Sequence, residues 1–231
     1  MTDPGTPVVD VRIWGVRSTL GALRRMAGGR RALRQVPGLR FGKLLGTGSA
    51  RTFTPRDADP HHWALVSVWD DEAAADAGAS SQLVRSWTTA STEELSVRLR
   101  PLTSRGQWAR REPFGAPTGS REWSGPVAAI TRARLRPTRA LSFWRAVPPV
   151  VSELTDAPGL QLALGIGEAP IGLQGTFSLW ESAADLTEFA YRSPEHRAAI
   201  RRTNPERWYA EELFARFAVT EVSGHYRGHT P

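Results

Sequence analysis

The chain has 231 residues, of which 40% are hydrophobic and 23% charged, as in ordinary globular proteins of one large or two small domains. It contains no cysteine, which excludes disulfides, thiolate catalysis and cysteine-ligated metal centres. The net charge is +7, but Lys43 is the only lysine and the arginines are scattered among carboxylates. We therefore do not expect nucleic-acid binding, whereas attraction to an anionic membrane surface is compatible with the charge.

The first residues, MTDPGTPVVD, are polar and lack the charged and then apolar layout of a signal peptide. No stretch approaches the roughly 18 apolar residues that a membrane span requires. We expect a cytoplasmic protein.

The first half of the chain predicts the order β-α-β-β-α-β. Ser18 is a plausible N-cap for a helix through Met26 that Gly28–Gly29 should interrupt, and Asp71 is a plausible cap for a helix through about Thr88. Residues 51–61 are polar and predict a loop. Alternating apolar residues predict strands over 8–16, 39–45, 62–69 and 94–102.

The same pattern returns after a segment rich in Gly, Pro, Ser and Arg, residues 109–125, which predicts a linker. Thr138 is a plausible cap for a helix through Leu154, with a kink at Pro148 and Pro149. A second helix is predicted over 183–191. Strands are predicted over 126–135, 160–166 and 171–180, and the last one begins at EELFARF.

The two halves match residue by residue in the same order. Trp69 corresponds to Trp180, Arg98 to Arg216 and Gly106 to Gly224. Such a series of matches indicates a tandem duplication. We predict an α+β fold in which two ferredoxin-like (βαββαβ) units, residues 8–108 and 126–226, form a single-chain dimeric-type α/β barrel.

Sequence motifs of common enzymes are missing. There is no H-E-x-x-H, G-x-S-x-G or P-loop pattern, and the G-x-G at Gly165–Gly167 lacks the rest of a dinucleotide fingerprint. His225 and His229 have H-x-x-x-H spacing, but they lie in a polar C-terminal tail, where we expect them to be solvated.

Two residues stand out as candidates for chemistry. His196 follows Ser193 and Pro194, which are typical of a helix N-terminus, and the matching position in the first half is Arg85. A cysteine-free haem protein needs a His, Tyr or Met ligand, so His196 is a candidate metal ligand, although it could equally cap or pack a helix. Lys43, in the middle of a strand, either binds an acidic group such as a haem propionate or is a solvated lysine of an edge strand.

The stretches VPGLRFGKLLGTG with a following FTP, SVRLRPLTSRGQW and GIGEAPIGLQGTFSLWES resemble the spheroidene monooxygenase family, the acyclic carotenoid 2-ketolases. The resemblance extends from about Val11 to Phe217. It implies a b-type haem, dependence on O2, and a haem ligand supplied by a helix of one half, which favours His196.

We therefore expect a haem-dependent monooxygenase of carotenoid or secondary metabolism that oxidises an apolar or small organic substrate with O2 and an electron donor. Haem would lie between the second-half sheet and its helices. Two alternatives remain open: a cofactor-free monooxygenase of the antibiotic-biosynthesis type, and a non-catalytic protein that binds haem or an apolar ligand. Peripheral membrane association and a homo-oligomer are also compatible with the sequence. The expected site consists of the metal ligand His196, the polar residues Arg216, Arg98 and Lys43, and the apolar walls Trp180, Phe177, Phe189 and Trp208.

Overall fold

The computed structural model describes residues 7–49, 57–115, 123–135, 154, 157–168, 175–192 and 209–231. Its strands are β1 (Val8–Val16), β2 (Leu39–Gly48), β3 (Ala58–Trp69), β4 (Ser91–Gly106), β5 (Val127–Leu135), β6 (Leu160–Gly167), β7 (Gly175–Trp180) and β8 (Tyr209–Gly224). Its helices are α1 (Thr19–Leu33), α2 (Glu72–Ala79), α3 (Gln82–Thr88) and α6 (Ala183–Arg192).

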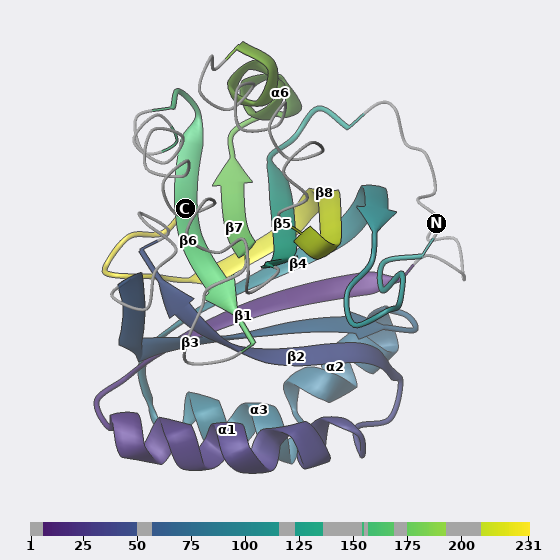
Figure 1. Cartoon of the computed structure of the whole chain (residues 1–231). Coiled ribbons are helices and arrows are strands. Elements are labelled where there is room, and N and C mark those ends of the chain that lie inside the picture. Colours follow the sequence, from purple (N-terminus) through teal and green to yellow (C-terminus); the bar gives the residue numbers. More distant parts are fainter. Residues whose placement is uncertain are drawn as a thin grey trace.

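The strands form one closed barrel in the order β1-β3-β2-β6-β7-β5-β8-β4 (Figure 1). Each half contributes four neighbouring strands in ferredoxin-like order, and all the pairs are antiparallel. The halves meet along a long seam between β4 and β8 and a short one between β2 and β6, where Gly46–Gly48 pair with Gly165–Gly167. The predicted α+β barrel of two ferredoxin-like units is confirmed.

Apolar side chains fill the barrel. Alternate residues of each strand point inward, and their large members, such as Phe177 and Phe217, are fully buried. Phe114, in the segment predicted as a linker, packs edge-on against Phe217 with 4.8 Å between the ring centroids. Because an eight-stranded barrel is just wide enough for its side chains, the outer faces of the sheets remain as places for a ligand.

The helices cover the outside of the barrel, with α1, α2 and α3 on the first half and α6 on the second (Figure 1). The two caps predicted in the first half are confirmed, since Ser18 accepts a hydrogen bond from Gly21 N and Asp71 accepts one from Ala74 N. None of the helices that the structure describes has the length and apolar character needed to cross a membrane.

Several predicted element boundaries are wrong. The first helix does not stop at Gly28–Gly29 but continues to Leu33, because Gly29 lets the helix lie against Leu44 of the sheet. The predicted helix over 71–88 is two helices, because Ser81 caps α3 through a hydrogen bond from Val84 N.

Two strands of the first half are longer than predicted. β3 starts at Ala58, inside the predicted loop, and β4 extends to Gly106 because it pairs with β8 of the other half. In the second half, the helix predicted from Thr138 lies outside the described residues apart from Leu154, and the strand predicted over 171–180 is described from Gly175.

Two helical glycines offer a matched test of this packing. A Cβ on Gly78 would meet the Trp69 ring at 2.1 Å, whereas a Cβ on Gly28 would meet nothing within 4 Å. We expect Gly78→Ala to lower the free energy of unfolding by about 1–3 kcal/mol through overpacking. Gly28→Ala should raise it by about 0.5–1 kcal/mol, because alanine has the higher helix propensity. Urea unfolding measures both, and a Gly78→Ala variant as stable as the wild type would contradict the packing of α2.

Candidate functional site

The outer face of the first-half sheet is completely packed by its own helices. Trp14 and Trp63 point outward from β1 and β3 and meet Trp87 of α3, with ring centroids 5.4 and 6.2 Å apart. Leu44 and Leu65 belong to the same buried cluster. The large side chains of the first half therefore fill this layer themselves.

The corresponding face of the second half carries small residues instead. The strand registers of the two halves are equivalent, since Val8 pairs with Trp69 as Val127 pairs with Trp180. At equivalent positions, the second half has short side chains where the first half has large or charged ones. The replacements are Ala133 for Trp14, Gly165 for Leu44, Thr176 for Leu65, Thr131 for Arg12 and Ala129 for Asp10.

We call Ala129, Thr131, Ala133, Gly165 and Thr176 the small-residue face. Gly165, Thr176 and Thr131 are direct neighbours across three adjacent strands. The hydroxyls of the two threonines make no hydrogen bond within the described part of the chain. The face is therefore mostly apolar and carries two hydroxyl groups, with Ala133 and Gly165 buried and the other three members partly buried.

Arg216 lies beside this face and lacks the carboxylates that hold its counterpart. In the first half, Arg98 donates to Asp10 (3.0 Å) and to Asp76 (2.7 Å). The equivalent residues of the second half are Ala129 and Thr187. Among the described residues, the Arg216 guanidinium contacts only the Thr187 hydroxyl, at 3.4 Å. The second half thus offers an arginine that has no anionic partner within the described residues, next to Ala129.

Aromatic side chains border the same layer. Trp180 of β7 and Phe189 of α6 have ring centroids 5.4 Å apart and pack with Val127 and Leu186. Phe177, although predicted as part of the same wall, points into the barrel and is fully buried there. Trp180, Phe189 and Arg216 therefore lie on the outer side of the second-half sheet, and Phe177 lies on its inner side.

Lys43 also lies on the inner side of the barrel wall. Its ammonium group contacts Glu168 at 2.7 Å, and Glu168 also accepts from Arg132 and from the Trp108 indole. Burial opposes ionisation of Glu168, but the hydrogen bonds from Lys43 and Trp108 outweigh it and lower its pKa. Arg132 pairs in turn with Glu211. Lys43, Arg98 and Arg216 thus occupy three separate environments.

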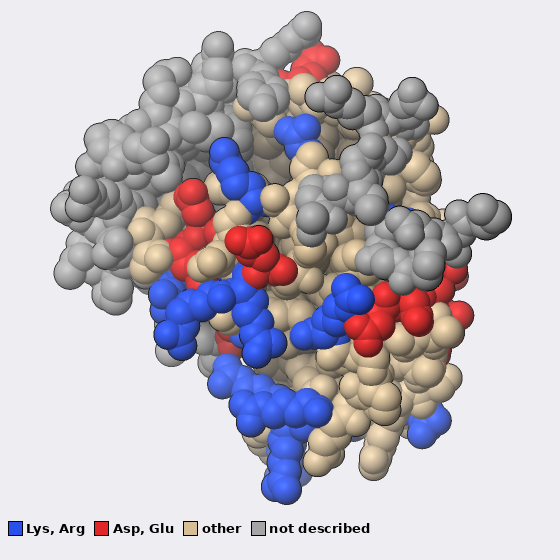
Figure 2. Space-filling view, turned by 90° about the vertical axis from the view of Figure 1, so that its right-hand side faces the viewer, with Lys and Arg blue, Asp and Glu red and all other residues tan. Residues whose placement is uncertain are grey.

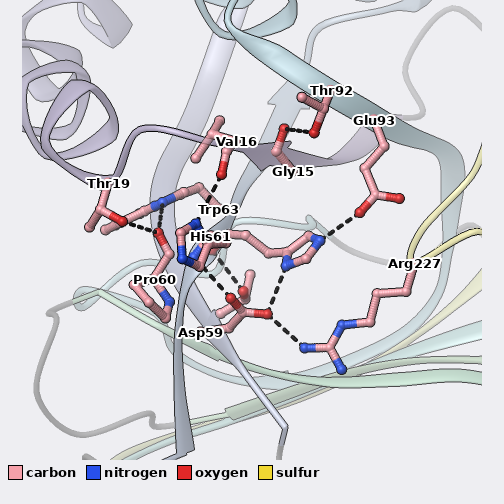
Figure 3. A network of polar contacts seen from close by, with 12 residues as sticks. Gly15, Val16, Thr19, Asp59, Pro60, His61, Trp63, Thr92, Glu93 and Arg227 are labelled. Atoms are coloured by element: carbon pink, nitrogen blue, oxygen red, sulfur yellow. Dashed lines mark hydrogen bonds and ion pairs between the residues drawn. The ribbon is translucent and has the colours of Figure 1, made fainter.

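Sequence reasoning missed a polar network around His62 (Figure 3). One ring nitrogen contacts Asp59 at 2.7 Å and the other contacts Glu93 at 2.6 Å. Asp59 also accepts from Arg227, in the turn closed by the bridge between Tyr226 and His229. Only the folded chain brings these residues together, so no local motif revealed them. The network fastens the C-terminal turn to the barrel and leaves neither ring nitrogen of His62 open to a ligand.

The predicted metal ligand cannot be placed. His196 and Trp208 lie outside the described residues, so their roles stay predictions. Within the part of the chain that is described, no group of three or more His, Asp or Glu side chains is arranged to hold a metal ion.

Because Arg98 and Arg216 lie in different environments, we expect their substitution to change the stability of the protein by different amounts. Burial raises the pKa of Asp10, and Arg98 opposes that shift. Arg98→Gln would leave Asp10 buried without its cation, so we expect the free energy of unfolding to fall by about 3 kcal/mol. Arg216→Gln should change it by less than about 0.5 kcal/mol. Urea unfolding compares the two variants, and equal losses would show that Arg216 also has a structural ion-pair partner.

The His62 network predicts a pH dependence of stability. Burial disfavours the imidazolium, but the hydrogen bonds to Asp59 and Glu93 outweigh it and raise the pKa of His62 above 6.5. The stabilisation by protonated His62 is therefore complete below about pH 6.5 and is lost as the pH rises through the raised pKa. His62→Gln should flatten this decline, whereas the exposed His229→Gln should retain it. Chemical unfolding across this pH range measures both, and a decline that survives in His62→Gln would assign it to another group.

No protein-family model matches the chain. It is 35% identical over 223 residues to the spheroidene monooxygenase of Rhodobacter capsulatus, a match that covers 95% of this chain and 92% of that protein. It is 36% identical to the spheroidene monooxygenase of Rubrivivax gelatinosus, over 94% of this chain and 80% of the relative.

Among solved structures, an aldoxime dehydratase crystallised with butyraldoxime matches with a TM-score of 0.62 and 11% identity. That match covers 94% of this chain and 81% of the other, and it supports the fold alone. The sequence matches decide the family: the chain belongs to the spheroidene monooxygenase family and is an oxidoreductase of the monooxygenase class.

Proposed function

We propose that the protein is a haem-dependent monooxygenase that oxidises an apolar substrate of the spheroidene type, with its haem on the small-residue face of the second half. The observation that carries this proposal is the replacement of Trp14, Leu44 and Leu65 by Ala133, Gly165 and Thr176 at equivalent positions. The first half fills this layer with side chains, and the second half has shorter ones on the same backbone.

The residues that are described fit a flat, acidic group such as haem. The floor of short side chains allows a planar ring system to approach the backbone. Arg216 supplies a cation for a propionate, in the layer where its counterpart Arg98 is already neutralised. His196 follows the end of α6 closely in the sequence, and in this proposal it would supply the ligand to the haem iron. When bound, haem supplies the activation of O2.

The chain's own residues then bind and orient the substrate and exclude water from it. Trp180 and Phe189 provide an apolar border for the substrate. The hydroxyls of Thr131 and Thr176, which make no hydrogen bond to another described residue, are the hydrogen-bonding groups of the small-residue face, where they can orient a bound oxygen-containing group. A monooxygenase inserts one atom of O2 and reduces the other to water, so an external donor must supply two electrons and solvent two protons.

The substrate class rests on the family. The relatives are named for spheroidene, and they match this chain over almost its whole length. An apolar polyene also suits a face whose members carry no charge.

The test is the absorption spectrum of the full chain expressed with added haem. We expect a Soret band that His196→Ala abolishes. Thr176→Leu restores the first-half residue at that position, so it should weaken haem binding at least about tenfold by steric conflict. Arg216→Gln should weaken it by a factor of about ten through loss of one charged hydrogen bond.

Thr89→Leu is the matched control, because Thr89 is exposed at the C-terminal end of α3, on the first half of the barrel. It should leave haem affinity unchanged. Oxygenase activity without a bound chromophore would overturn the haem assignment and favour a cofactor-free enzyme. A Soret band insensitive to Thr176→Leu would move the haem to another face.

A further inference from the structure

The outward face of α1 is both apolar and basic. Leu20 and Leu23 are 59% and 43% exposed, and they are the two exposed large hydrophobic residues in the described part of the chain. The opposite face of the helix packs on the protein through Ala22, Gly29 and Leu33. Nothing in the packing of α1 therefore requires leucine at these two outward positions.

Exposed arginines surround the two leucines. Over the chain as a whole the arginines are scattered among carboxylates, but residues 11–56 are an exception and contain no Asp or Glu. Figure 2 shows Lys and Arg side chains projecting from the lower end of the molecule, the level at which α1 lies in Figure 1. We call the following residues the basic face: Arg17, Leu20, Leu23, Arg24, Arg30, Arg31 and Arg34.

Stability of the helix accounts for only part of this pattern. Arg30 and Arg31 lie in the last turn of α1, where cations favourably oppose the helix dipole. Arg25 is directed toward α3 and donates to the carbonyl of Ser86 at 2.9 Å. Neither explanation applies to Arg24, which is exposed in the middle of the helix beside Leu20 and Leu23.

We propose that the basic face docks on the surface of an anionic lipid bilayer. Guanidinium groups bind lipid phosphates and are attracted by the negative surface potential of the membrane. Leucines that flank them enter the boundary between headgroups and acyl chains, as in interfacial amphipathic helices. The combination of the two kinds of residue selects this partner.

Other occupants fit the face less well. A second copy of the chain would place one arginine-rich face against another, and like charges repel. A nucleic acid would use the arginines but has no apolar surface that suits Leu20 and Leu23. A bilayer alone satisfies both features.

This docking is independent of the proposed haem site. Figure 1 places α1 and α6 at opposite ends of the molecule. Contact through α1 leaves the small-residue face on the side away from the bilayer. The contact thus recruits the protein to the membrane surface and does not itself deliver a substrate to that face.

The experiment is co-sedimentation of the full chain with phosphatidylcholine vesicles that do or do not contain phosphatidylglycerol. We expect binding to the anionic vesicles that weakens as salt is added. Arg24→Gln with Arg31→Gln should lower the affinity roughly 30-fold, as expected for two arginines near an anionic surface. Leu20→Gln with Leu23→Gln should lower it about fivefold or more through loss of apolar insertion.

The matched control is Arg110→Gln with Arg111→Gln, which removes the same charge from an exposed turn elsewhere on the barrel. It should change the affinity by less than about twofold. Thermal unfolding verifies that each variant is folded. An equal loss in the control, or equal binding to neutral vesicles, would overturn the proposal. Normal binding by the leucine variant, together with competition by single-stranded DNA, would identify a polyanion site in place of a membrane contact.

Discussion

Closure of the barrel is the constraint on which the rest of this structure depends. Each four-stranded sheet has an apolar inner face that it can bury only against the other sheet. Closing eight strands leaves space for side chains and little else. The interior is accordingly occupied by apolar residues, with the ion pairs of Lys43 and Arg132 among them. The haem site that we propose therefore lies in an outer layer.

The duplication supplies an internal comparison for the outer layers. Two sheets with the same register and nearly the same backbone carry different side chains at matched positions. Trp14 and Arg98 are fully engaged by their surroundings, whereas their counterparts are Ala133 and an arginine without a carboxylate partner in the described residues. The differences concentrate on one face, while matched scaffold residues such as Trp69 and Trp180 remain the same.

The repeat is the reason that the architecture could be predicted from the sequence. Gly106 and Gly224 match because both have positive φ, and a Cβ on either would lie within 2.2 Å of a backbone oxygen on the neighbouring strand. Spacing along β7 could also have separated Phe177 from Trp180, because residues three apart on a strand point to opposite faces. We nevertheless predicted them as one wall.

Other features could not be predicted, because they depend on distant pairing. β4 continues beyond residue 102 only because β8 lies beside it. The contacts of His62 with Glu93 and of Asp59 with Arg227 join segments far apart in the sequence. Lys43 stood out by composition, yet its partner Glu168 lies in the other half. Local patterns identify elements but do not specify which charges meet across a closed barrel.

The joining of both units in one chain has a further consequence. In a barrel assembled from two identical subunits, every substitution occurs twice. Shorter side chains in the outer layer of one sheet would therefore appear on the other sheet as well. Covalent fusion removes that symmetry requirement. Trp14 and Leu65 can then stabilise one sheet by packing in its outer layer, while the shorter Ala133 and Thr176 occupy the equivalent positions on the other sheet. In our proposal the result is a barrel with one haem-binding face, and its stoichiometry is fixed at one such face for each polypeptide.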